Sequence, residues 1–251
     1  FFYFSLPFSA FFSIFAMQCT RGGIGRHATL RGWCRLRRAS SSLVVCTMLL
    51  KIHPQGIEQK QLDIICNCLE KGGVIIYPTD TVYAFACKLG NLKASEKLAS
   101  LKGKKFEKSN FSIVCNNISQ ASDFIKPLSN DFFRVLKHNT PGAFTFVFEA
   151  SSKIPKILQT KKKTIGIRIP DSDIAQRIVE LLGYPILTSS LPTEDMELEE
   201  YTNPEIMEEI YDSKVDIIID NGIGGDKTST VIDFTCGEIN IIREGIGELV
   251  L

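Results

Sequence analysis

The sequence predicts a single α/β domain of the α+β type, and two observations lead to this prediction. Short apolar runs typical of strands alternate with segments of helical periodicity, unlike a helix bundle or a β-sandwich. The 204 residues from Met48 onward also suit one domain whose core is stable without disulfides.

The first 47 residues differ in composition from the rest of the chain. They contain six Arg but no Lys, Asp or Glu, whereas the remainder carries 23 basic and 28 acidic residues, a formal charge of −5. Phe1–Met17 is at the short limit for a membrane span and lacks the charged start of a signal peptide, so targeting is the weaker alternative. Arg21–Leu36 resembles a translated bacterial tRNA gene. We therefore expect residues 1–47 to be a disordered, non-native extension and residues 48–251 to be the domain, with no membrane anchor.

Five segments have the apolar spacing of helices. The first, Ile57–Lys71, ends at Gly72-Gly73. The others are Lys93–Leu101, Asn130–His138, Ser172–Leu182 and Asn203–Tyr211. Asp171-Ser172 and Asn203-Pro204 supply cap residues at two of these starts.

Eight short apolar runs are expected to form strands. They are Val74–Tyr77, Phe111–Cys115, Phe144–Phe148, Ile165–Ile169, Pro185–Leu187, Val215–Ile219, Thr230–Phe234 and Ile239–Ile242. The acidic segment Met196–Tyr201 is expected to be a solvated loop or lid.

Cysteine and histidine spacing predicts no protein metal site. The five cysteines after Met48 are odd in number and lie mostly in apolar runs, which indicates reduced thiols in a cytoplasmic protein. Cys66-Asn-Cys68 has the wrong spacing for zinc and no second ligand pair.

A lysine cluster follows the second predicted helix. Lys102, Lys104, Lys105 and Lys108 fall within seven residues, just before a predicted strand. Flexible ammonium groups at this spacing can contact several phosphate oxygens, although a solvated helix end is the alternative and the glycines of a P-loop are missing.

Hydroxyl side chains gather at four predicted strand ends. They are Thr79 and Thr81, Thr145, Thr188-Ser189-Ser190, and Thr228-Ser229-Thr230. Such groups can orient a small polar substrate, although turns and caps explain any single one of them.

Arg168 could hold a substrate carboxylate. Alternation places it on the opposite face of its strand from Ile165 and Ile167, where a guanidinium can bind a carboxylate bidentately. A surface salt bridge is the alternative. The sequence contains no recognisable arrangement for covalent nucleophilic catalysis.

From Met48 to the end, the chain resembles the YrdC/YciO family of threonylcarbamoyl-AMP synthases, and in particular its YciO branch. The matching motifs are Gly72–Tyr83, Leu101–Lys104, Asn139–Gly142, Phe144–Phe146, Lys163–Pro170, Leu187–Ser190, Thr228–Asp233 and Arg243–Gly247. The resemblance implies a YrdC-like domain with a twisted mixed sheet around a basic cavity. It also implies a nucleotidyltransferase that converts L-threonine, bicarbonate and ATP, with Mg²⁺, into threonylcarbamoyl-AMP and pyrophosphate. Partner proteins would use this product to make N6-threonylcarbamoyladenosine at position 37 of tRNA.

The resemblance also implies roles for individual residues. Lys102, Lys104 and Lys108 would hold the triphosphate, Arg168 the threonine carboxylate, and Thr81 and Ser189 the amino acid. The nucleotide side would be lined by Thr145, Ser190, Ser229 and Arg243.

Three departures from the synthase pattern leave alternatives open. Where the synthases have Lys-x-Arg, this chain has Lys102-Gly-Lys104, and where they have Tyr-Gly it has Tyr83-Ala84. In place of Ser-x-Ser-Ala-Asn it has Thr188–Pro192. Proline has no donor in place of the amide, and Ala84 could crowd a glycine position. A related enzyme acting on an acyl adenylate is one alternative. A module that binds tRNA or double-stranded RNA is another, although the acidic balance argues against broad RNA affinity.

Overall fold

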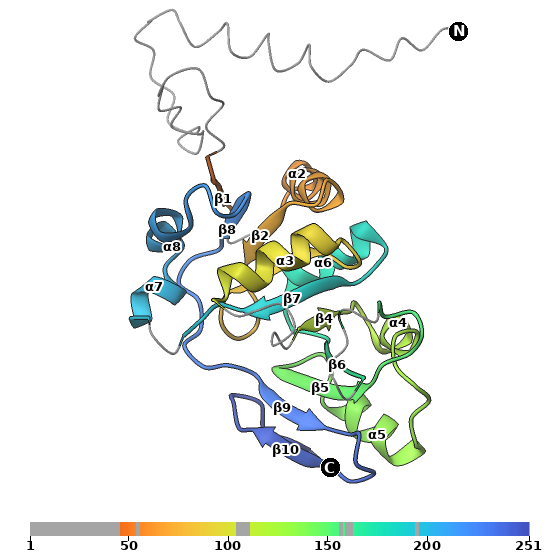
Figure 1. The fold of residues 1–251 in the computed structure, drawn as a ribbon. Coiled ribbons are helices and arrows are strands. Elements are labelled where there is room, and N and C mark those ends of the chain that lie inside the picture. Colours follow the sequence, from red (N-terminus) through yellow and green to blue (C-terminus); the bar gives the residue numbers. More distant parts are fainter. Residues whose placement is uncertain are drawn as a thin grey trace, which may run out of the picture. The chain divides into compact units, whose positions relative to one another are not determined.

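Among the described residues the sheet contains ten strands, two more than predicted, and it mixes parallel with antiparallel pairs as predicted. The structure is a computed structural model that describes residues 46–53, 56–103, 111–155, 158, 163–193 and 196–250. These residues belong to one compact unit, Gly32–Leu251. The strand order is β1-β8-β2-β3-β7-β4-β6-β5-β9-β10, which runs from top to bottom in Figure 1.

The strands are short and most of them are buried. Their bounds are β1 Met48–Lys51, β2 Val74–Tyr77, β3 Ala84–Lys88, β4 Ser112–Val114, β5 Phe144–Glu149, β6 Thr164–Arg168, β7 Ile186–Ser190, β8 Ile217–Asp220, β9 Thr230–Asp233 and β10 Asn240–Arg243. Parallel pairs are β1/β8, β2/β8, β4/β6 and β5/β9, and the other neighbouring strands are antiparallel.

The described residues form seven helices, and most of them begin with a side-chain cap. Their bounds are α2 Gln59–Glu70, α3 Leu92–Leu101, α4 Ile118–Ser122, α5 Asn130–His138, α6 Asp173–Leu182, α7 Leu198–Thr202 and α8 Pro204–Tyr211. The predicted caps Ser172 and Asn203 accept hydrogen bonds from Ala175 N–H and Glu205 N–H. None of the described helices is long and apolar enough to cross a membrane.

Four expectations about elements were wrong. Strands β1 and β3 were not predicted, because β1 is a four-residue strand whose partner lies far along the chain and β3 is rich in alanine. Part of the segment expected to be a loop, Met196–Tyr201, forms α7. Strand β7 continues to Ser190, so the Thr188–Ser190 hydroxyls lie within the strand and not after it.

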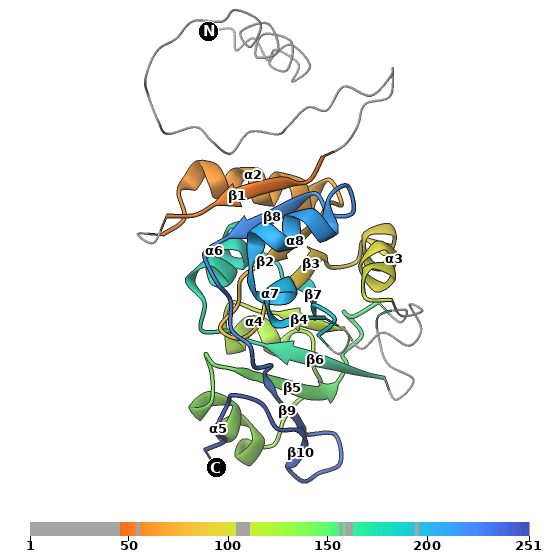
Figure 2. The same cartoon turned by 90° about the vertical axis from the view of Figure 1, so that its left-hand side faces the viewer.

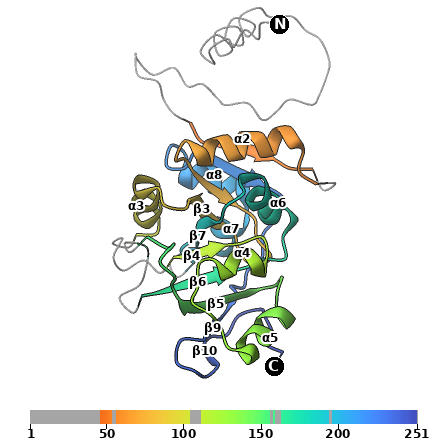
Figure 3. The same ribbon diagram turned by 90° about the vertical axis from the view of Figure 1, so that its right-hand side faces the viewer.

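Two hydrophobic clusters pack on opposite faces of the sheet. The larger cluster includes buried residues of α3, α4, α5 and α8 and the row Phe146, Ile167, Ile113 and Leu187. The smaller cluster lies under α2 and α6, which pack against each other (Figure 3). Helices α7 and α8 are consecutive and pack against each other, and α8 lies beside β8 (Figure 2).

The start of the described region is already part of the packed domain. The hydroxyl of Thr47 donates to the carbonyl oxygens of Tyr211 and Val215, at 3.1 and 2.7 Å, and only 4% of the residue is exposed. The packed region therefore includes at least one residue of the extension that was predicted to be disordered up to residue 47. Residues 1–45 of that extension lie outside the described residues.

The described cysteines are all free. Burial raises the pKa of the Cys87 and Cys115 thiols to about 12, so both stay protonated at neutral pH. They pack as small apolar side chains in the larger cluster.

Candidate functional site

One face of the sheet changes from apolar to polar along the strand order. The smaller cluster under α2 and α6 takes residues from β8, β2, β3, β7 and β4 but none from β6, β5 or β9. Beyond it, the strand register and alternation place Ser112, Thr145, Gly166, Arg168 and Thr188 on this same face. Ser112 is half-buried, and the other four residues are buried.

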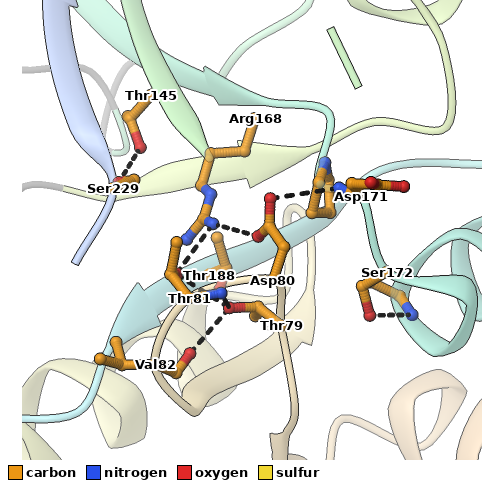
Figure 4. A network of polar contacts seen from close by, with 12 residues as sticks. Thr79, Asp80, Thr81, Val82, Thr145, Arg168, Asp171, Ser172, Thr188 and Ser229 are labelled. Carbon is orange, nitrogen blue, oxygen red and sulfur yellow. Dashed lines mark hydrogen bonds and ion pairs between the residues drawn. The ribbon is translucent and has the colours of Figure 1, made fainter. Parts of the chain in front are cut away.

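Arg168 forms a buried ion pair with Asp80 in the centre of this polar area. Its Nη2 lies 2.7 Å from Asp80 Oδ1, and both side chains are 8% exposed. The same nitrogen donates to Thr81 Oγ1 at 3.1 Å (Figure 4). Arg168 Nε is buried and has no hydrogen-bond partner among the described residues. Because a buried unpaired donor is costly, this nitrogen indicates the position of a ligand or water.

The loop between β2 and β3 holds Asp80 and Thr81 in place. Thr79 Oγ1 donates to the Val82 carbonyl at 2.8 Å and accepts from Thr81 N–H at 3.1 Å. Asp80 Oδ2 accepts a hydrogen bond from the backbone N–H of Asp171 at 3.2 Å, next to the start of α6. Asp80 therefore connects this loop to the end of β6, and both of its carboxylate oxygens are used.

A second polar group joins β5, β9 and β10. Thr145 Oγ1 and Ser229 Oγ are 2.8 Å apart, and Arg243 donates to the Ser229 carbonyl from Nε and Nη2, at 3.2 and 2.8 Å. Desolvation lowers the pKa of Arg243, and the positive charge of Arg168 lowers it further. Phe146 pairs with Ile167, so the adjoining Thr145 and Arg168 are neighbours across β5 and β6. The two guanidinium groups thus add positive potential to one region.

Lys102 approaches the site from the other face of the sheet. It is the C-cap of α3, and its Nζ donates to Ser189 Oγ at 2.8 Å and to Ser190 Oγ at 3.2 Å. Ser189 pairs with Phe85 of the larger cluster, so it faces the side on which α3 packs. The structure therefore places Ser189 with Lys102, whereas Thr81 lies with Arg168. Lys104 and Lys108 lie outside the described residues.

Two of the departures from the synthase pattern have clear structural settings. Ala84 is buried in the smaller cluster under α2 and α6, so its methyl group packs in the core. Leu191 is 1% exposed, and its N–H donates to the Tyr83 carbonyl at 3.3 Å. Leu191 of the Leu-Pro variant therefore packs in the core. The position after it, Pro192, is the one at which the synthase pattern has the polar residue Asn.

An open, shallow cavity of about 400 Å³ adjoins Ser229 and Arg243 along the chain. Its lining residues are Asp226, Lys227, Thr228, Glu244 and Gly245. The backbone of Gly245 lies against Thr228–Thr230, so a side chain there would overlap that strand. The cavity therefore extends the site on the side predicted to hold the nucleotide.

Sequence reasoning had found Thr81, Thr145, Arg168, Ser229 and Arg243, which the structure brings together. It missed Asp80, although this residue stands between two threonines that were identified. It also missed Ser112 and Gly166. A glycine in the middle of an otherwise β-branched strand was the available signal for a close approach.

Comparison with known proteins identifies relatives over most of the described domain. The family model Sua5_yciO_yrdC, described as "Telomere recombination", matches residues 67–245. YciO of Escherichia coli (strain K12) is 37% identical over 199 residues, covering 79% of this chain and 95% of that protein. The threonylcarbamoyl-AMP synthase of Coxiella burnetii (strain RSA 493 / Nine Mile phase I) is 28% identical over 174 residues, covering 69% and 92%.

Solved structures give the same result for the fold. The crystal structure of E. coli YciO matches with a TM-score of 0.75 and 36% identity, over 80% of this chain and 97% of that one. P. abyssi Sua5 complexed with L-threonine matches with a TM-score of 0.67 and 24% identity, over 79% of this chain and 58% of that one. The predicted α/β fold is therefore confirmed.

Proposed function

This chain belongs to the Sua5/YciO/YrdC family, and from that premise we propose that it is an L-threonylcarbamoyladenylate synthase. Its substrates are L-threonine, bicarbonate and ATP, and its products are threonylcarbamoyl-AMP and pyrophosphate. Proteins that modify adenosine 37 of tRNA then consume the adenylate. The observation that carries the proposal is the buried Arg168, whose Nε has no described partner and which neighbours the hydroxyls and guanidinium of the second polar group.

The site's charge distribution fits this product. Threonylcarbamoyl-AMP carries a carboxylate and a phosphate, and the site offers two guanidinium groups that interact electrostatically. Arg168 takes the threonine carboxylate and Thr81 the amino acid. Thr145, Ser229 and Arg243 line the nucleotide side, next to the cavity at Asp226–Thr228. Buried charge-assisted hydrogen bonds are strong enough to orient both substrates.

The chemical step needs positioning more than a protein base. The threonine amine and bicarbonate form a carbamate with loss of water, and the carbamate is already an anion. One of its oxygens bonds to the α-phosphorus while the bond to the β-phosphate oxygen breaks, and pyrophosphate leaves with that electron pair. Lys102, fixed by Ser189 and Ser190, stabilises the departing negative charge together with Lys104 and Lys108.

Mg²⁺ is proposed to enter with ATP. Within the described residues no three His, Cys, Asp or Glu side chains gather at one point, so this part of the chain offers no carboxylate cage. Phosphate oxygens and water are ligands that Mg²⁺ accepts readily, and the ion neutralises phosphate charge when bound.

A second candidate is a related enzyme that cleaves threonylcarbamoyl-AMP or a similar acyl adenylate. Two observations favour it. The YciO relative is more similar to this chain than the synthase is, and Leu191-Pro192 replaces a pair that would end in an amide donor. Such an enzyme would keep the anion-binding groups but lose the requirement for bicarbonate. The RNA-binding alternative depends on lysines that lie mostly outside the described residues.

Pyrophosphate release by the full chain tests the proposal. With ATP, Mg²⁺, bicarbonate and L-threonine present, we expect release that stops when any one of them is omitted. Lys102→Ala is expected to lower the rate about tenfold, equivalent to a barrier increase of roughly 1.4 kcal/mol, because a fixed charge near the leaving group is lost.

Lys153→Ala is the matched control, because Lys153 is exposed and pairs with the exposed Asp123. It should leave the rate unchanged. Release that continues without threonine and bicarbonate, or cleavage of added threonylcarbamoyl-AMP in place of synthesis, would contradict the synthase and favour the second candidate.

A further inference from the structure

Gly166 is required for space and not for backbone conformation. It lies in the middle of β6 and is not among the glycines with positive φ. A Cβ built on it would overlap Ser112 Oγ and would come within 3.2 Å of Thr145 Cγ2. Glycine weakens a strand interior, and it is typical of places where another group must approach the backbone closely. Here it lets the Ser112 side chain lie flat against β6.

The hydroxyl of Ser112 has no hydrogen-bond partner among the described residues. Ser112 pairs with Gly166 on one side and with Thr188 on the other, so its side chain lies on the polar face that carries Arg168. It is partly exposed, in contrast to Ile113 and Val114, which are buried in the two clusters. Ser112 is therefore a donor at the base of the site that no described protein group uses.

Ser112 and Gly166 lie between the two sets of substrate-binding groups. Arg168 follows Gly166 by two residues on the same face and contacts Thr81 and Asp80. Thr145, whose methyl group also lies against Gly166, contacts Ser229. In the proposed reaction the carbamate joins the amino acid to the α-phosphate, so it must lie between these two sets.

We propose that Ser112, lying flat against Gly166, is a substrate-binding residue whose hydroxyl donates to the one-carbon anion, first bicarbonate and then the threonine carbamate. This assignment rests on the proposed synthase function. The buried positive charge of Arg168, on the same face of the sheet, also attracts this anion. Bicarbonate is a small planar anion with few acceptor atoms, so a small subsite is enough to bind it. Ser112 and Arg168 supply such a subsite.

The steady-state kinetics of Ser112→Ala test this assignment in the full chain. We expect the KM for bicarbonate to rise about tenfold, as for loss of a hydrogen bond to a charged group, while the KM values for ATP and threonine stay within about twofold. Ser122→Ala, which removes an exposed hydroxyl on α4, is the control and should change none of them.

Gly166→Ala separates packing from function. Alone, it should lower thermal stability, because its Cβ displaces Ser112 Oγ. Adding Ser112→Ala removes the displaced oxygen, so the double variant should regain stability but keep the raised KM for bicarbonate. An unchanged bicarbonate KM in Ser112→Ala, or its recovery in the double variant, overturns the assignment alone. No turnover by the wild type overturns the synthase function, and this assignment with it.

Discussion

An Arg168→Ala variant is expected to lose at least about 100-fold in kcat/KM for threonine, which corresponds to about 2.7 kcal/mol of transition-state stabilisation. Arg168 is 7% exposed, and Nε is its buried donor without a described partner. A carboxylate bound there exchanges water for a desolvated guanidinium, so the interaction is stronger than at the surface. The measurement is pyrophosphate release as a function of threonine concentration.

Arg168→Lys separates lost charge from lost geometry. It keeps a cation near Asp80 but removes Nε and the planar fork, so we expect a folded protein that still loses most of its activity. Arg134→Ala is the matched control, because Arg134 is exposed and pairs with the exposed Asp131. Near wild-type activity in Arg168→Lys would show that the guanidinium geometry is unimportant and would remove Arg168 from the carboxylate site.

Asp80→Asn is expected to destabilise the protein by about 3 to 5 kcal/mol, a large part of the stability of a typical domain. The substitution leaves the Arg168 charge buried without its counter-ion, since both side chains of the pair are 8% exposed. Urea unfolding at pH 7 measures the loss, and the m-value should be unchanged.

Two further variants show whether the unpaired buried charge of Arg168 causes the loss of stability. Asp80→Asn/Arg168→Gln removes both charges and should recover much of the stability without recovering activity. Asp123→Asn breaks the exposed pair with Lys153 and should cost no more than about 1 kcal/mol. If Asp80→Asn lowered the free energy of unfolding by less than about 1 kcal/mol, water would already solvate Arg168, and this would contradict a buried anion site.

Local pattern predicted the face of Arg168 but not its partner. Alternation with Ile165 and Ile167 is a property of β6 itself, and the structure confirms it. Asp80 lies 88 residues away, and only the order β7-β4-β6 beside the β2–β3 loop brings it close. The alternative of a surface salt bridge was wrong because the pair is buried.

Thr145 and Ser229 illustrate the same limit. They are 84 residues apart and meet because β5 and β9 are parallel neighbours, a pairing that no local signal specifies. For Ser189, in contrast, the local alternation of its own strand decides the contact. The family resemblance implied contact with the amino acid, yet strand alternation turns Ser189 toward α3 and Lys102. Assigning β7 its full length through Ser190 would have exposed this difference between Ser189 and its neighbours.

The most direct test of the account is the identity of the nucleotide that the full chain makes from ATP, Mg²⁺, L-threonine and ¹³C-bicarbonate. Mass spectrometry of the reaction should find threonylcarbamoyl-AMP that carries the ¹³C label, and Arg168→Ala should abolish it. Formation of AMP or ADP without a labelled adenylate, or loss of threonylcarbamoyl-AMP supplied from outside, would contradict a synthase and leave an enzyme that uses the same anion-binding face on a different substrate.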